Sequence, residues 1–453
     1  MKDYITIIGG GLAGCEAAYQ IAKAGIKVKL YEMKPEKFSP AHTNTNLAEI
    51  VCSNSFKSNL HTNACGLLKE ELRMLDSLLI KTADETSVPA GQALAVDREK
   101  FSRKITDKLE EIENIEIIRQ EVTNIDEIAK EGIVIIATGP LTSDALSEQI
   151  IKMTGKDKLS FYDAAAPIIE KESINFDIAF YGNRYDQERE KEETIEDWKA
   201  RIENLKDKAY INLPMNKEEY EQFVKELVNA EIVELHEFEK REIFEGCMPI
   251  EIMAKRGIDT LRFGPLKPVG FTDPRIGRRP YAIVQLRQDN EEGNVFNMVG
   301  FQTNLKFGEQ KRVFSLIPGL ENAQFVKYGV MHRNTFINSP KLLNETYQMK
   351  ENKNIYFAGQ ITGVEGYVES ISSGMVAALN AIKNFQGKEE KIIFPKETII
   401  GALANYISTL NEDFQPMNAN FGILPKLEER IKDKKVKYEK LADIAISKLK
   451  ENI

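Results

Sequence analysis

Residues 4–32, YITIIGGGLAGCEAAYQIAKAGIKVKLYE, decide the fold of this chain. An apolar run, Ile5 to Ile8, predicts a buried parallel strand, and the glycines that follow it fit the pattern G-x-G-x-x-G. An alanine-rich segment up to about Ala24 predicts a helix, and Lys27 to Tyr31 predicts a second strand that ends at Glu32. Strand, glycine turn, helix, strand and acid in this order predict a dinucleotide site.

Each glycine of the turn has a physical role in such a site. Gly9 permits the tight turn, Gly11 lets a pyrophosphate approach the backbone, and Gly14 lets helix and strand pack closely. The helix N-terminus offers free N–H groups to phosphates, and the acid accepts hydrogen bonds from ribose hydroxyls. The alternative is a glycine-rich turn in an ordinary βαβ unit. The candidate cofactor-binding residues of this unit are Gly9, Gly10, Gly11, Gly14, Glu32 and Met33.

Length and composition are those of a multidomain globular protein. The 453 residues suggest two or three domains, and 42% hydrophobic with 29% charged residues is ordinary for this class. No apolar run approaches the ~20 residues that span a bilayer. Because the first strand starts almost at the N-terminus, a signal peptide has no room, and we expect a cytoplasmic protein.

The four cysteines, Cys15, Cys52, Cys65 and Cys247, are scattered and include no C-x-x-C pair. With four histidines as well, the chain suggests neither a disulfide framework nor a structural zinc site, and we expect no metal. Cys15 and Cys65 are expected to pack in the core. A lone reactive thiol remains open among the others.

Further glycine-bearing turns follow later strands. A strand from Ile133 ends in Ala137-Thr138-Gly139, a tripeptide common beside the cofactor of two-dinucleotide flavoproteins. A late strand, Ile355 to Phe357, leads into Gly359-Gln360 and Gly363, and a small-residue helix follows. Such a strand–glycine–helix unit closes FAD sites from the C-terminal side. Thr138, Gly139, Gly359, Gln360 and Gly363 are therefore further candidates for binding FAD.

Other patterns outline the remaining chain. Residues 39–58 are polar and predict a loop beside the cofactor, residues 65–82 have helical apolar spacing, and Asp97 predicts a helix N-cap. We expect an α/β protein with a Rossmann-type FAD-binding domain and an inserted smaller α/β domain. The expected limits are 1–166 for the first part of the FAD domain, 167–289 for the insertion and 290–453 for the second part. The oligomeric state is not readable.

One segment carries positive charge although the net charge is −9. Residues 255–287 contain eight basic and two acidic residues. Arg275, Arg278 and Arg279, with Phe271 and Tyr281 near them, suit phosphate contacts and base stacking. The other interpretation is a solvated surface with local ion pairs.

Three segments together resemble the TrmFO (older name Gid) family of folate- and FAD-dependent tRNA uracil-5-methyltransferases. They are GGGLAGCEAAYQIAKAGIKVKLYEMKP, then NLAEIVCSNSFKS with PAGQALAVDRE, and FEGCMPIE with IYFAGQITGVEGYVESISSG. The related, longer GidA family shares the nucleotide motifs, but this chain is too short for its extra C-terminal region. The resemblance implies methylation of the T-loop uridine of tRNA with 5,10-methylenetetrahydrofolate, FAD and NAD(P)H.

The resemblance also implies roles for residues. Uracil C5 is a poor nucleophile until a thiolate adds to C6, and Cys247, with Lys255 and Arg256 soon after, is the candidate nucleophile. Cys52 is assigned a flavin-side role, as proton donor or alternative nucleophile. Gln360 replaces the acid that many flavoproteins place on the ribitol, with Glu365 and Glu369 as other candidates. The basic segment becomes a candidate RNA-binding surface.

Three other functions remain open. The same chemistry could act on a ribosomal RNA uridine, since no single motif separates the two substrates. A flavin oxidoreductase acting on a small metabolite would make FEGCMPIE and the basic segment incidental. A non-catalytic FAD-binding regulator would retain FAD without folate-dependent methylation.

Overall fold

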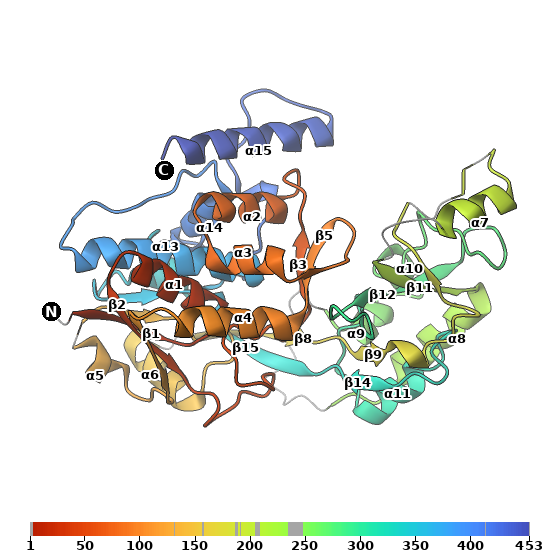
Figure 1. The fold of residues 1–453 in the computed structure, drawn as a ribbon, viewed down its shortest axis with the longest axis horizontal. Coiled ribbons are helices and arrows are strands. Elements are labelled where there is room, and N and C mark those ends of the chain that lie inside the picture. The colour runs from red at the N-terminus through yellow and green to blue at the C-terminus, as the bar shows by residue number, and fades with distance from the viewer. Residues whose placement is uncertain are drawn as a thin grey trace.

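The computed structural model describes residues 3–130, 132–155, 158–185, 189–190, 192–203, 209–233, 248–412 and 414–452. Within these residues, Figure 1 shows two bodies side by side. The larger holds the N-terminal and C-terminal segments, and the smaller is formed by the middle of the chain. The predicted α/β class, with a smaller domain inserted into the larger one, is confirmed.

The larger body is built on a five-stranded parallel sheet. Its strands, in spatial order, are β16 (Ile355–Phe357), β7 (Val134–Ile136), β1 (Tyr4–Ile8), β2 (Lys27–Glu32) and β6 (Ile115–Arg119). In the register of the sheet, Ile7 of β1 lies opposite Leu30 on one side and Ile135 on the other. All three side chains are fully buried, which is why these strands are near-continuous apolar runs.

Two helices from opposite ends of the chain pack directly on each other in this body. They are α1 (Leu12–Lys23) and α13 (Tyr367–Phe385). A Cβ at Gly374 would lie 2.3 Å from the carbonyl oxygen of Ala13, so the close approach requires glycine. The glycine turn before each helix therefore faces the same region.

The remaining elements of the larger body surround this pair. The helices are α2 (Ala64–Met74), α3 (Leu78–Glu85), α4 (Arg98–Glu110), α5 (Ile125–Ala129), α6 (Asp144–Thr154), α12 (Ser339–Leu342), α14 (Ile399–Ser408) and α15 (Lys434–Lys450), with 3₁₀ turns η4 (Gln360–Thr362) and η5 (Phe421–Ile423). A small antiparallel sheet contains β3 (Ser55–Ser58), β5 (Ala93–Val96) and β4 (Ser87–Val88).

Residues 65–82 are largely helical, as their apolar spacing predicts, but they form two helices because the chain breaks between α2 and α3. Asp76 has a φ of +57°, which interrupts the helix. The Ser77 side chain accepts a hydrogen bond from the N–H of Ile80 and so starts α3, and its hydroxyl donates to Glu16 at 2.7 Å. The predicted N-cap at Asp97 is confirmed, because its carboxylate accepts from the N–H of Lys100 at 2.9 Å.

The smaller body is a six-stranded sheet with helices. Its strands, in spatial order, are β10 (Phe180–Tyr181), β11 (Tyr210–Met215), β12 (Ala282–Gln288), β13 (Val295–Met298), β9 (Ile168–Glu170) and β14 (Phe325–Lys327), and all described pairs are antiparallel. Its helices are α7 (Ile195–Glu203), α8 (Lys217–Asn229), α9 (Ile250–Lys255), α10 (Thr260–Phe263) and α11 (Phe307–Phe314), with the 3₁₀ turn η1 (Lys171–Ser173).

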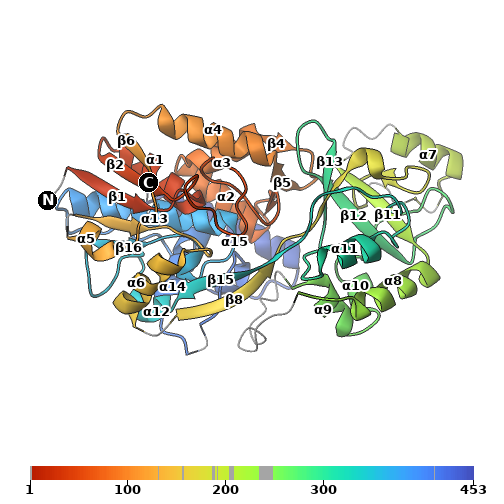
Figure 2. The same cartoon turned by 90° about the horizontal axis from the view of Figure 1, so that it is seen from below.

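The inserted domain extends beyond residue 289, the limit expected from the sequence. β13 and β14 lie in the same sheet as β12, and α11 contributes Val313 and Phe314 to the same core. The chain enters by β8 (Lys158–Ala164) and returns by β15 (Met331–Ile337), which pair antiparallel over their whole length. Figure 2 shows this pair running toward the smaller body. The connection is therefore double, and it lies beside the region where the two bodies meet.

Candidate active site

The glycine turn after β1 forms one end of a cavity in the larger body. Gly9 has a φ of +108°, and a Cβ there would lie 2.5 Å from the carbonyl oxygen of Ala137. A Cβ at Gly14 would lie 1.9 Å from the carbonyl oxygen of Gly9, whereas one at Gly11 would meet no atom within 4 Å. The tight turn and the close packing predicted from the sequence are present, and the backbone at Gly11 faces open space.

Glu32 closes this end of the cavity from the tip of β2. Its carboxylate accepts hydrogen bonds from the N–H of Gly10 and from the N–H of Lys34, both at 3.0 Å. The side chain is thus fixed at the wall of the cavity, with acceptor capacity remaining on both oxygens. Glu32 and Met33 both line the cavity.

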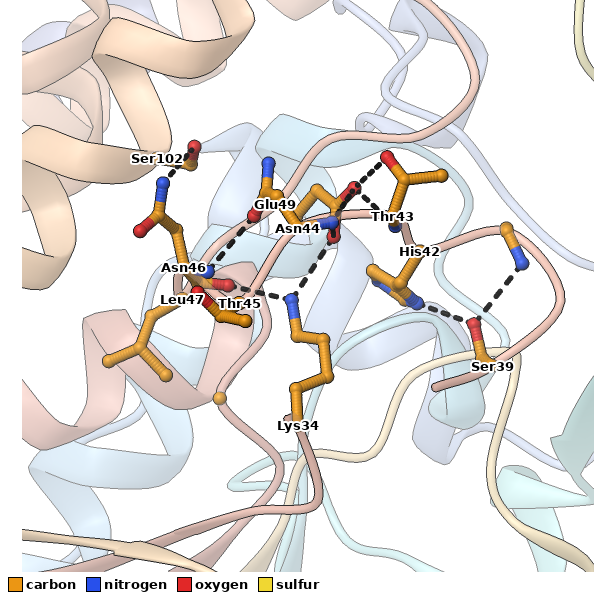
Figure 3. A network of polar contacts seen from close by, with 12 residues as sticks. Lys34, Ser39, His42, Thr43, Asn44, Thr45, Asn46, Leu47, Glu49 and Ser102 are labelled. Carbon is orange, nitrogen blue, oxygen red and sulfur yellow. Dashed lines mark hydrogen bonds and ion pairs between the residues drawn. The ribbon is translucent and has the colours of Figure 1, made fainter. Parts of the chain in front are cut away.

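The polar loop after β2 forms another wall around an ion pair that the sequence analysis missed (Figure 3). Lys34 Nζ lies 3.1 Å from Glu49 Oε2 and donates to the carbonyl of Asn46 at 2.6 Å. Glu49 also accepts from the N–H of Thr43 at 2.8 Å. The Lys34 and Glu49 side chains are 4% and 7% exposed, and both line the cavity together with His42. Lys34 and Glu49 are 15 residues apart in a polar loop, so no helical or strand periodicity in the sequence indicates that they pair.

Most of the predicted cofactor residues surround this one cavity. Those on its lining are Gly9, Gly10, Gly11, Glu32, Met33, Thr138, Gly139, Gly359 and Gln360. Gly14 lies behind the turn. Gly363 is absent from the lining of either cavity described here; its φ is +84°, and a Cβ there would lie 2.5 Å from the ring of Phe414.

A second cavity continues from the first, between the two bodies. The two share five lining residues, namely Val51, Pro140, Leu141, Gln360 and Tyr367. The larger body contributes Cys52 to the second cavity, and β12 and β13 of the smaller body contribute Arg287 and Asn297. Glu365 and Glu369 also line it. The shared wall makes the two cavities parts of one continuous site.

Tyr367 holds the Cys52 loop in place. Its hydroxyl oxygen accepts hydrogen bonds from the N–H groups of Cys52 and Ser53, both at 3.0 Å. Burial raises the pKa of Tyr367, so the phenol stays neutral. The first residue of α13 therefore positions a loop that lies more than three hundred residues earlier in the chain.

A buried ion pair joins the two bodies beside this loop. Arg98, the first residue of α4, donates to Asp289 from Nε at 2.9 Å and from Nη2 at 3.1 Å. The Arg98 and Asp289 side chains are only 14% and 6% exposed. Arg98 Nη1 also donates to the carbonyl of Ile50 at 3.3 Å, so the same side chain contacts the loop.

Two further cations lie near Cys52. Arg287 donates to Ser53 Oγ at 2.6 Å and to Asn54 Oδ1 at 3.0 Å, and burial lowers its pKa. Burial also lowers the pKa of Lys327, with Arg98 acting in the same direction and Cys52 in the opposite one. Together with Arg98, these groups place three basic side chains around the loop that carries Cys52.

The other cysteines have different surroundings. Cys15 and Cys65 are buried in the core, as predicted, and burial raises the pKa of both thiols, that of Cys65 to about 11. Cys247 lies outside the described residues, so its position beside or away from the cavities is not described.

The predicted RNA-binding arginines lie away from the cavities. Arg275, Arg278 and Arg279 are exposed and line neither one. Arg275 forms a two-pronged ion pair with Asp273, with Nη2 at 2.8 Å from Oδ2. Their loop adjoins the segment before α7, where the N–H of Arg189 donates to Thr272 at 3.0 Å. Figure 1 places α7 at the end of the smaller body farthest from the parallel sheet.

Comparison with known proteins identifies the family. A family model described as glucose inhibited division protein A (GIDA) matches residues 4–389. A relative from Acetivibrio thermocellus, named methylenetetrahydrofolate–tRNA-(uracil-5-)-methyltransferase TrmFO, is 59% identical across 100% of this chain and 99% of its own. A protein of the same name from Ligilactobacillus salivarius is 55% identical across 100% and 98%. The chain belongs to the TrmFO family.

A solved structure agrees with the fold of this TrmFO-family chain. GidA from Aquifex aeolicus superposes with a TM-score of 0.68 at 16% identity, covering 99% of this chain and 73% of the GidA chain. At this identity the likeness concerns the fold alone.

Among the described residues there is neither a metal-binding cluster nor a membrane-spanning helix. No group of three or more His, Cys, Asp and Glu side chains there is arranged to hold a metal ion. No helix among those residues is long and apolar enough to cross a membrane.

Proposed function

We propose that this TrmFO-family chain methylates C5 of the T-loop uridine of tRNA, with 5,10-methylenetetrahydrofolate as carbon donor. The observation that carries the proposal is the 59% identity with the TrmFO of A. thermocellus over both whole chains. FAD acts as carrier and reductant, NAD(P)H supplies electrons, and the reaction takes place in the cytoplasm.

The groups on the wall of the first cavity suit FAD. The open backbone at Gly11 and the N-terminus of α1 suit a pyrophosphate, and Glu32 suits the ribose hydroxyls. Thr138, Gly139, Gly359 and Gln360 line the same cavity, and Gln360 also lines the second one. The bound flavin supplies the one-carbon transfer and hydride chemistry.

The chain itself supplies two thiols in separate roles. The Cys247 thiolate adds to C6 of uracil, which shifts electron density to C5 so that C5 can attack the carbon unit; its departure later restores the C5–C6 double bond as the C5 proton leaves. Cys52 acts on the flavin side as a proton donor. The Tyr367 hydroxyl and the side chains of Arg98 and Arg287 support this role by holding the loop that carries Cys52 at the second cavity.

The uridine must leave its folded loop to reach such a site, which requires cations on the phosphates. We assign these contacts to Arg275, Arg278 and Arg279 on the outer end of the smaller body. The double variant Arg278→Ala with Arg279→Ala should lose tRNA affinity and show a shallower salt dependence, while FAD stays bound. If the tRNA affinity of the double variant equals that of the wild type across a salt series, tRNA does not bind this surface.

Incubation with unmodified tRNA, methylene-labelled 5,10-methylenetetrahydrofolate and NADPH tests the function. Label should appear in 5-methyluridine of the T-arm, and Cys247→Ala should abolish it. Parallel reactions with a ribosomal RNA transcript test the other RNA substrate. If FAD is retained but neither RNA is labelled, turnover of a small substrate would favour an oxidoreductase, and no turnover would favour a regulator.

A further inference from the structure

One buried amide in the second cavity has a nitrogen that finds no partner among the described residues. Asn297 lies on β13, opposite Arg287 of β12 and Ile168 of β9 in the sheet register. It is 2% exposed and lines the cavity. Its Nδ2 is buried and finds no hydrogen-bond acceptor within the described part of the chain.

The same sheet shows what the fold does for a buried asparagine that has only a structural role. Asn212 on β11 is fully buried, donates from Nδ2 to the carbonyl of Gly182 at 2.8 Å and accepts from Gln285 at 3.2 Å. A buried amide without such partners is destabilising, since it loses water and gains nothing. Nδ2 of Asn297 has no such partner in the described part of the chain, which points to a partner on a bound ligand.

The chemistry of a carboxamide defines that partner. It carries a donor and an acceptor in one plane, and either orientation of the amide presents both. Its planar complement is a lactam edge, a ring C=O next to a ring N–H. The same cavity is lined by further carboxamides, those of Gln302, Asn334 and Gln360.

We propose that Asn297 is a specificity-determining residue that pairs with the lactam edge of a planar heterocycle bound in the second cavity. This rests on the proposed function, which brings two substrates with such an edge, the pterin of the folate and the uracil of the RNA. The isoalloxazine of the flavin carries the same edge and is the third source.

Asn297→Leu tests the inference because leucine keeps the volume and removes only the amide. Since no described residue pairs with Nδ2, the melting temperature of Asn297→Leu should equal or exceed that of the wild type, whereas Asn212→Leu should melt earlier. Asn294→Ala, on the exposed turn before β13, is the control for ligand binding and should bind all three ligands as the wild type does.

Equilibrium binding, which needs no turnover, separates the three sources. We expect Asn297→Leu to weaken one ligand by about 10-fold or more. Weaker tetrahydrofolate binding assigns the pterin, weaker binding of a T-arm RNA hairpin assigns uracil, and loss of FAD or a shifted flavin spectrum assigns the isoalloxazine. Affinities for all three within twofold of wild type, or a melting temperature lowered as in Asn212→Leu, would overturn the inference. Absence of methylation in the wild type would refute the proposed function and leave this binding test intact.

Discussion

Replacing Asp289 by asparagine should loosen the junction between the two bodies. The change removes the charge that Arg98 faces while keeping the shape of the side chain. Both side chains are largely shielded, at 6% and 14% exposure, so the guanidinium charge would stay buried without its counter-charge. Removing one partner of a buried ion pair lowers the free energy of unfolding by about 3–5 kcal/mol. Because the asparagine oxygen can still accept a hydrogen bond from Arg98, we expect a loss near the lower limit, about 3 kcal/mol.

The matched control is the exposed ion pair a few residues away. Lys100 and Glu291 also connect α4 to the hairpin between β12 and β13, but their side chains are 47% and 65% exposed. Glu291→Gln should therefore cost less than about 1 kcal/mol. Its main-chain N–H, which donates to Asp97 at 2.9 Å, is unaffected by the change.

Urea unfolding measures both variants with two probes. The single tryptophan, Trp198, is fully buried in the smaller body and its fluorescence reports that body, whereas flavin release reports the larger one. Because Arg98 also contacts Ile50 near Cys52, methylation should fall in Asp289→Asn even in the absence of urea. If Asp289→Asn and Glu291→Gln lose the same free energy of unfolding, burial does not make the Arg98–Asp289 pair contribute more to stability than the exposed pair.

Three other changes test separate parts of the site and the core. Gly14→Ala should destabilise the protein because its Cβ would overlap the carbonyl of Gly9, whereas Gly11→Ala should fold normally and lose only FAD affinity; equal melting temperatures would contradict this. Tyr367→Phe should cost about 1–3 kcal/mol and lower methylation by leaving the two loop N–H groups without an acceptor, and unchanged kinetics would disprove the positioning role. Burial raises the pKa of Glu71 from 4.5 to about 8. As the pH rises, the unfolded chain therefore loses this proton before the folded protein does. The free energy of unfolding should fall by up to about 5 kcal/mol between pH 4.5 and pH 8 and stay level above pH 8. Glu71→Gln should lack this fall, and a variant with the pH dependence of the wild type would reject the assignment to Glu71.

Local patterns predicted the part of the fold that is contiguous in sequence. The strand, glycine turn and helix from Ile5 onward follow from the local preferences of consecutive residues. The N-cap at Asp97 is local as well, because its carboxylate accepts a hydrogen bond from an N–H three residues later. The break at Asp76 was missed because apolar spacing continues through it. The positive φ of Asp76 and the N-cap at Ser77 make the break, and the contact of Ser77 with Glu16 of α1 is a long-range one.

Long-range contacts account for what could not be predicted in the site. Arg98 and Asp289 are separated by 191 residues, and Cys52 and Tyr367 by 315. An arginine at the start of a helix and a tyrosine after a glycine have many ordinary explanations, and only the folded chain brings them to one loop. The end of the insertion was similarly hidden, since β13 and β14 resemble strands of either body until their pairing is known.

The origin of the methyl carbon tests the central claim most directly. The protein is incubated with unmodified tRNA, NADPH and 5,10-methylenetetrahydrofolate that carries two deuterium atoms on its methylene group, and the digested T-arm is analysed by mass spectrometry. Transfer of the folate carbon predicts 5-methyluridine whose methyl group retains both deuterium atoms. Unlabelled 5-methyluridine, or none, would contradict the account.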